Sequence, residues 1–374
     1  MQNSQAPWIE IKRSSQVLKS LQGGSNNEQN LLWQAMFACQ IVIRSYEERL
    51  NFKWGFNPAV LLEEALDRQK LFIESQLNTN PIDPQLEQRT LSLRCICVPK
   101  SGLLLGLVAK ILAESQEKAQ SAASNYLREI ESTFPYDYII RPAVSMAEFN
   151  LLIGKEIFRK CNNPASIAQI RRFESPLQTS KGVLHIVGMW QTGKRSDEQT
   201  WRALAHYPQD ILLNISICPT TLFEDERRAL LKIKQLATVS QDDSSNEPYL
   251  ENYEAWVDPF ISRHISPWNR YFYLQVHLVS TAEIDECLLH SIGASITREG
   301  PEIPTPGFQI VHPSNKNEAI EWCKHLDSLD IIHTNKSLLL PRLSELASVD
   351  EAHAVFRFPY PPASGLPNVV FLEE

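Results

Sequence analysis

The stretch LSLRCICV, residues 91–98, decides how the rest of the chain is interpreted. Its short apolar run between polar segments predicts a β-strand, and it opens a pattern that the sequence then repeats. The first unit continues with a long helix predicted from about Leu103 to Thr133. The strand YDYIIRP (136–142) and the helix AEFNLLIGKEIFRK (147–160) complete it.

Two more units repeat this alternation of strand and helix. The second consists of VLHIVGMW (183–190), DEQTWRALAHY (197–207), DILLNISICP (210–219) and EDERRALLKIKQLA (224–237); the third of YFYLQVHLVS (271–280), EIDECLLHSIGASI (283–296), GFQIVH (307–312) and NEAIEWCKHLDSL (317–329). Four Ser/Thr-x-x-Glu/Gln pairs fit the spacing of a capping box at helix starts. They are Ser145/Glu148, Ser196/Gln199, Thr221/Glu224 and Ser280/Glu283.

Before these units, FACQIVIRS (37–45) and RLNFKWGF (49–56) predict a β-hairpin, and Pro58 opens a helix. The predicted fold class is therefore α/β to α+β: an N-terminal hairpin followed by three βαβα-like units, with helices packed on one face of mixed sheets. An acidic, small-residue stretch suggests the main internal linker. The predicted segments are 1–89 (hairpin and helix), 90–239 (units one and two), 240–252 (acidic linker or loop), 253–335 (unit three) and 336–374 (C-terminal helix and Pro-rich strap).

The composition argues against several classes of function and location. The 374 residues are 43% hydrophobic and 21% charged, which is typical of a globular chain, and the net charge of −8 argues against direct nucleic-acid binding. The start lacks a secretory signal, and the longest apolar tract is too short to span a membrane. The seven cysteines show no disulfide-framework spacing, so we expect reduced, mostly buried thiols in a cytoplasmic protein.

One stretch resembles a phosphate-binding loop. Gly188, four residues, Gly193 and Lys194 match most of G-x-x-x-x-G-K-[ST] after an apolar strand. However, Arg195 replaces the Ser or Thr whose hydroxyl would bind Mg²⁺. The predicted helix also begins late, at Ser196 to Asp197, and with acidic residues where a nucleotide would place its own negative charge. A polar turn after a buried strand is the preferred interpretation, and nucleotide binding at Gly188, Gly193 and Lys194 is the alternative.

No other motif indicates a catalytic or metal site. Cys95 and Cys97 lie on one face of a strand but have no second cysteine pair, so packing explains them. Arg171 and Arg172 are interpreted as part of a solvated helix face. We therefore expect no catalytic residue, no metal and no cofactor.

The most distinctive text is LLLPRLSELASVDEAHAVFRFPYPPASGLPNVVF, residues 338–371. It resembles the segment that joins the N-terminal region of HerA-like and conjugation (type IV secretion)-type DNA-translocating ATPases to their motor. Residues 203–231 resemble the same N-terminal region less specifically. This sequence has no positions for the motor's own P-loop lysine, metal-holding acid or arginine finger.

The resemblance implies a non-enzymatic accessory protein that assembles with a separately encoded HerA/FtsK-type ATPase subunit, or with copies of itself. Prolines bar the tail from a helix or a central strand, so its apolar side chains either cover their own domain or face a partner. The resemblance favours the partner. The candidate interface is Phe356, Arg357, Phe358, Tyr360 and Leu366. On this view, a chain truncated after Val355 folds but no longer binds its partner.

Overall fold

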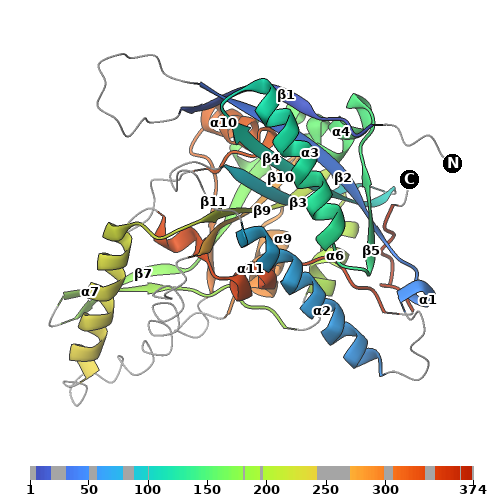
Figure 1. The fold of residues 1–374 in the computed structure, drawn as a ribbon. Helices are drawn as coiled ribbons and strands as arrows, with labels where there is room; N and C mark the ends of the chain where they lie inside the picture. The colour runs from blue at the N-terminus through green and yellow to red at the C-terminus, as the bar shows by residue number, and fades with distance from the viewer. Residues whose placement is uncertain are drawn as a thin grey trace, which may run out of the picture.

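A ten-stranded antiparallel sheet forms the centre of the protein in the computed structural model (Figure 1). The structure describes residues 6–17, 31–49, 57–78, 88–99, 101–179, 182–193, 197–241, 270–298, 306–332, 342–362 and 364–372. Eight strands follow the order β1-β2-β4-β3-β9-β10-β6-β11, while β5 pairs with β2 and β12 with β10. The strands are β1 (Glu10–Val17), β2 (Leu31–Ile43), β3 (Arg89–Val98), β4 (Gly102–Ala113), β5 (Tyr138–Pro142), β6 (Ile167–Arg172), β9 (Ile211–Thr220), β10 (Tyr271–Ser280), β11 (Phe308–Val311) and β12 (Leu346–Ala347).

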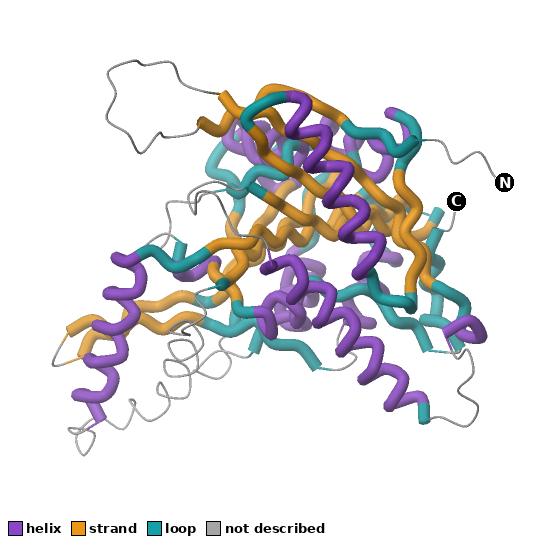
Figure 2. The backbone as a smooth tube through the Cα atoms, viewed as in Figure 1, coloured by secondary structure: helices purple, strands orange, loops and turns teal. Residues whose placement is uncertain are grey.

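Helices cover both faces of this sheet (Figures 1 and 2). One apolar cluster packs beneath α2 (Pro58–Ser75), α3 (Gln116–Thr133), α6 (Asp197–Ala205), α9 (Glu286–Ile296) and α11 (Val349–Val355). A second cluster packs beneath α4 (Met146–Ile153), α5 (Lys155–Lys160) and α10 (Lys316–Asp327). The α+β class is thus confirmed. Two details were wrong, because helices cover two faces rather than one and the strand ladders are antiparallel rather than mixed.

The long helix predicted from Leu103 to Thr133 is instead a strand followed by a helix. Residues 103–113 belong to β4, which pairs with β2 and β3 and is buried along nearly its whole length. An apolar run buried on both faces has no period-2 alternation, so its sequence cannot be distinguished from that of a buried helix. The helix α3 begins only after Ser115, whose side chain accepts a hydrogen bond from the Lys118 N–H at 3.2 Å.

The predicted hairpin is confirmed only in its first strand, which is β2. Tyr46–Arg49 forms the short helix α1, and residues 50–56 lie outside the described part. The N-terminal half of β2 pairs with β1 on one edge and with β4 on the other, and β1 was not predicted from the sequence.

The predicted helix caps had mixed outcomes. Ser145 caps α4 as expected. Thr221 and Ser280 are not caps, because α7 (Glu224–Gln241) begins three residues after Thr221 and α9 is capped by Asp285. Ser196 lies outside the described residues. A full capping box occurs instead at Ser348 and Glu351, at the start of α11.

Arg171 and Arg172 lie on the buried strand β6 rather than on a solvated helix face. The Arg172 guanidinium is fully buried and lies 2.7 Å from the equally buried carboxylate of Glu351. It also donates to the Ser344 carbonyl at 2.8 Å. These partners belong to the C-terminal segment, so charge pairing between distant segments overrides the usual exposure of arginine.

A smaller unit projects from the sheet at the lower left of Figures 1 and 2. It consists of the hairpin β7 (Glu174–Thr179) and β8 (Gly182–Val187), together with α7. The acidic linker predicted at 240–252 lies outside the described residues from 242 onward. The segment boundaries stay a prediction, although the ten-stranded sheet takes strands from four of the five segments.

Candidate interaction surface

The P-loop-like stretch leaves β8 and packs tightly against other parts of the chain. The Gly188 N–H donates to the Phe173 carbonyl at 2.6 Å, and the Gln191 N–H donates to the Ile296 carbonyl at 3.0 Å. A Cβ on Gly188 would lie 2.7 Å from the Gly307 carbonyl oxygen. Gly188 is therefore required by a close approach of backbones, and two N–H groups of the loop are already bonded within the protein.

The loop then meets the C-terminal tail. The exposed Gly193 offers its carbonyl to the Arg357 guanidinium, which donates at 2.9 Å. Lys194 lies outside the described residues. The two stretches singled out in the sequence, 188–193 and 356–366, are thus brought into contact by the fold.

Phe356 and Phe358 of the tail are fully buried within their own chain. The Phe358 ring lies 5.1 Å from that of Phe134 and 5.3 Å from that of Tyr138, at tilted or edge-to-face angles that aromatic pairs prefer. Leu366 is also buried. In this structure these side chains are part of the core. The apolar side chains of this part of the tail therefore cover their own domain rather than face a partner.

A side-chain amide holds the tail backbone beside α2. Gln69 accepts from the Phe358 N–H at 2.9 Å and donates to the Phe358 carbonyl at 3.2 Å. Its amide also donates to the Tyr138 hydroxyl at 2.8 Å, and that hydroxyl donates to the Pro359 carbonyl at 3.1 Å. Gln69 therefore satisfies backbone groups that an extended, proline-flanked segment cannot pair in a sheet.

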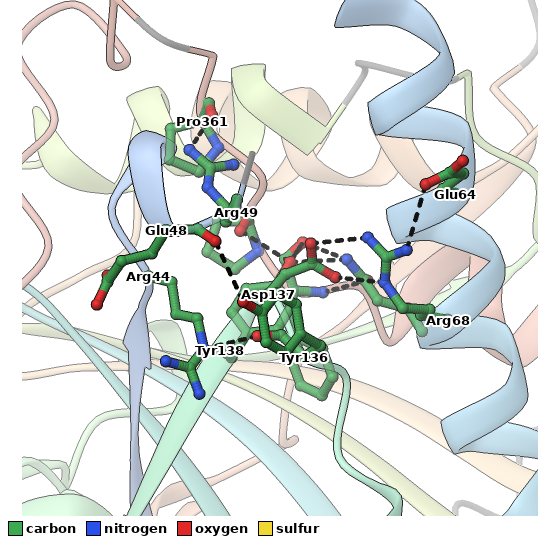
Figure 3. A network of polar contacts seen from close by, with 12 residues as sticks. Arg44, Glu48, Arg49, Glu64, Arg68, Tyr136, Asp137, Tyr138 and Pro361 are labelled. Atoms are coloured by element: carbon green, nitrogen blue, oxygen red, sulfur yellow. Dashed lines mark hydrogen bonds and ion pairs between the residues drawn. The ribbon is translucent and has the colours of Figure 1, made fainter. Parts of the chain in front are cut away.

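A network of charged and polar side chains lies next to this part of the tail and also contacts it (Figure 3). Arg68 of α2 donates two hydrogen bonds, of 2.9 and 2.8 Å, to the buried carboxylate of Asp137. This pairing raises the pKa of Arg68, with burial opposing it. On the other side, Arg49 donates to the Pro361 carbonyl at 2.9 Å and lies 4.4 Å above the Tyr360 ring. The network fixes the path of the tail between α1 and α2.

The end of the tail joins the sheet. Leu103 donates to the Val370 carbonyl at 2.8 Å, and Leu372 donates to the Leu103 carbonyl at the same distance. Gln40 of β2 donates to the Leu372 carbonyl at 3.1 Å. The tail is thus bound to its own domain at residues 357–361 and again at 370–372.

A pocket of about 250 Å³ lies beside the tail, between α1, the start of α2 and the tail residues Tyr360, Pro362 and Ser364. Its lining is mainly apolar. The lining residues are Tyr46, Pro58, Leu61, Leu62, Glu198, Tyr360, Pro362 and Ser364. Of the predicted interface residues, Tyr360 faces this pocket and stays partly exposed, whereas Phe356, Phe358 and Leu366 do not.

The buried polar face of the sheet was not predicted from the sequence. Arg94 of β3 is fully buried, donates to Asn214 Oδ1 at 3.0 Å and to the Ile153 carbonyl at 2.5 Å, and also bonds the Leu326 carbonyl. Burial lowers its pKa to about 10. Lys110 of β4 is equally buried and pairs with Asp330 at 2.8 Å. The repeated polar residues at alternate positions of the strands were the available signal, since such positions share one face.

Neither a scan against protein families nor a search of curated proteins finds a match for this chain. Within the described residues, no group of three or more potential metal-ligating side chains lies together. None of the described helices has the length and apolar character needed to cross a membrane.

Proposed function

We propose that this protein is a non-enzymatic interaction protein, equivalent to the N-terminal region of a HerA-like or secretion-type DNA-translocating ATPase, that assembles with a separately encoded motor subunit. The resemblance of residues 338–371 supports the family. We also propose a cytoplasmic location, which the seven free thiols support because disulfides are rare in reducing compartments.

One observation carries the preference for an interaction protein over a nucleotide enzyme. A phosphate loop must direct several backbone N–H groups at the anion. In this chain the Gly188 N–H donates a hydrogen bond to the Phe173 carbonyl, and the Gln191 N–H donates one to the Ile296 carbonyl. The stretch that most resembles a phosphate loop therefore serves as a packing element.

The surface that we assign to the motor subunit is the pocket beside the tail, with Tyr360, Pro362 and Ser364 on one side and Leu61 and Leu62 on the other. Apolar pockets with a polar rim are typical of positions that receive one anchoring side chain of a partner. The buried aromatics Phe356 and Phe358 act indirectly, because they hold the exposed part of the tail in place.

Co-expression with a HerA-like ATPase from the same genome, followed by pulldown and titration, tests this proposal. We expect Ser364→Arg to weaken binding at least about tenfold, which corresponds to ~1.4 kcal/mol. The matched control is Leu151→Arg, an exposed position on α4 at the opposite face of the sheet. The proposal fails if no ATPase binds, or if both variants bind equally well.

Calorimetric titration with ATP and Mg²⁺ tests the alternative function. We expect no binding heat. Tight binding that Lys194→Ala abolishes would instead establish a nucleotide site at residues 188–194. Light scattering of the isolated protein would show whether a homo-oligomer is the assembled form.

A further inference from the structure

The pocket beside the tail has apolar walls and one charged group. Of the described residues that line it, only Glu198 carries a formal charge at neutral pH. The others supply hydrocarbon, two tyrosine rings and the Ser364 hydroxyl. The volume of about 250 Å³ lies below the roughly 300–1,000 Å³ of pockets that hold drug-sized ligands, so the pocket suits one side chain of a partner better than a cofactor.

The carboxylate of Glu198 is placed to receive a cation. Glu198 is partly exposed and is the second residue of α6, where the helix dipole favours a negative charge. It also takes part in an interaction within its own chain. Because a carboxylate offers about four acceptor positions, it can still accept a bidentate pair of hydrogen bonds from a second group.

Exposed carboxylates accompany the lining residues. Glu47 and Glu48 follow Tyr46 on α1, and Glu63 follows Leu62 on α2. The arginines near α1 and α2 are instead bonded to acceptors of their own chain, as Figure 3 shows: Arg44 to the Tyr136 carbonyl at 2.7 Å, Arg49 to the Pro361 carbonyl at 2.9 Å, and Arg68 to the Asp137 carboxylate at 2.8 and 2.9 Å. The exposed Arg202 is the exception, one turn of α6 beyond Glu198 and not among the lining residues. Carboxylates therefore outnumber exposed cations around the described part of the pocket, which complements a positively charged partner group.

We propose that the pocket binds an arginine side chain of the motor subunit, with the guanidinium on the Glu198 carboxylate and the aliphatic stem against Leu61 and Leu62. An arginine combines such a hydrocarbon stem with a charged head. Its planar head bonds a carboxylate in bidentate geometry and stacks on aromatic rings, which Tyr46 and Tyr360 provide. Arginine is also enriched among the residues that contribute most to interfaces. Only the owner of this arginine rests on the proposed function; the preference of the pocket for an arginine does not.

Two other kinds of side chain would bind differently. A neutral apolar side chain would use the walls of the pocket without the carboxylate of Glu198. An acidic side chain would be attracted by Arg49, whose guanidinium lies 4.4 Å from the Tyr360 ring and 5.5 Å from the Tyr46 ring. However, Arg49 is not a lining residue, and its Nε and Nη1 atoms are buried. The pocket therefore presents a carboxylate, rather than a guanidinium, to the group that enters it.

Nuclear magnetic resonance of the isotope-labelled full chain tests this preference without any ATPase. The probes are acetylated, amidated peptides Gly-Gly-X-Gly-Gly, in which X is arginine, its uncharged isostere citrulline, leucine or glutamate. We expect the arginine peptide to shift the amide signals of Leu61, Leu62 and Ser364 with a dissociation constant in the millimolar range. The other three peptides should bind at least about tenfold more weakly, because none of them supplies a charged donor to the carboxylate.

Glu198→Gln should weaken binding of the arginine peptide at least about tenfold and remove its advantage over the citrulline peptide. The matched control is Glu74→Gln, at an exposed carboxylate of α2 that lies about 20 Å along the helix from Leu61. This control should leave both affinities unchanged. If Glu198→Gln fails to fold, the comparison of the arginine and citrulline peptides on the unaltered chain decides alone.

Equal binding of the arginine and citrulline peptides, tighter binding of the leucine or glutamate peptide, or unshifted amides would overturn the arginine pocket. This inference and the proposed function fail separately. An arginine-selective pocket in a protein that binds no ATPase would support the inference and remove the proposed function. An ATPase that binds the unaltered chain and the Glu198→Gln variant equally well would remove the inference alone.

Discussion

The side-chain amide of Gln69 bonds both backbone groups of Phe358, a residue 289 positions away in the sequence. The N–H of Phe358 donates to Gln69, and the Phe358 carbonyl accepts from it. An amide side chain thereby acts as a strand partner for one residue of the tail. The attachment explains how a proline-rich segment can lie in the core without leaving buried backbone groups unpaired.

Gln69→Leu should lower the free energy of unfolding by about 1–3 kcal/mol, because it leaves the buried Phe358 N–H without its acceptor and removes one of the two hydrogen bonds to the Phe358 carbonyl. Urea unfolding followed by circular dichroism measures this change. Leu71→Ala, at an exposed position of the same helix, is the control and should change stability by less than about 0.5 kcal/mol. Equal stabilities would mean that water replaces the amide and that the tail is loosely held.

Phe358→Ala should destabilise the protein by about 3–5 kcal/mol, since it empties a site enclosed by aromatic rings. Val370→Ala, on the exposed side of the same tail, should have little effect. For the same reason we now expect truncation after Val355 to unfold the chain rather than to leave a soluble domain. A folded truncated chain would show that the tail contributes nothing to the core.

Arg172→Met should lower the free energy of unfolding by about 3–5 kcal/mol, because the buried Glu351 carboxylate loses its cationic partner. The double variant with Glu351→Gln should lose less than the sum of the two single changes. Arg228→Met, which breaks the exposed pair with Glu224, should cost less than about 1 kcal/mol. Additive losses in the double variant would contradict a direct coupling between Arg172 and Glu351.

Stability should depend on pH through His277. Burial lowers the pKa of this histidine to about 3, and neither ring nitrogen has a hydrogen-bond partner among the described residues. The unfolded chain, with an ordinary histidine pKa near 6.5, binds the proton more readily than the folded chain. Stability is therefore fully present above about pH 6.5 and falls by up to about 1.4 kcal/mol per pH unit between there and about pH 3.

Burial also lowers the pKa of His353, to about 4. This second histidine therefore adds to the loss of stability as the pH falls from about 6.5 to about 4. Urea titrations at pH 7, 6 and 5 should show a shallower slope for His277→Gln than for the unaltered chain. His206→Gln, at an exposed position, is the matched control. An identical slope in the His277 variant would mean that this histidine charges without unfolding the protein.

When no nucleotide is present, Gly188→Ala should lower the free energy of unfolding by about 1–3 kcal/mol, because the added methyl group meets the Gly307 carbonyl. Thermal unfolding measures the loss. The variant separates a packing role of Gly188 from a phosphate-binding role. Unchanged stability would remove the packing argument for this glycine.

Much of the fold was predictable from local patterns. Apolar runs correctly predicted the strands β9 and β10, and the helix predicted at residues 317–329 corresponds to α10. The prediction was wrong where one sequence pattern is compatible with both a helix and a strand. The run Leu103–Ala113 suits a buried helix as well as a buried strand, and only its neighbours β2 and β3 select the strand by offering backbone partners.

By itself the sequence determined that this chain has an α+β fold, that the Gly188 stretch departs from a phosphate loop at Arg195, and that residues 356–367 cannot be helical. It could not determine which way the tail's apolar side chains point, nor that Arg94, Lys110 and Arg172 would be buried. Those outcomes depend on partners that are far away in the chain, such as Gln69 for Phe358 and Glu351 for Arg172. Burial of a polar or charged group is tolerated only where such partners converge, and that convergence exists only in the folded protein.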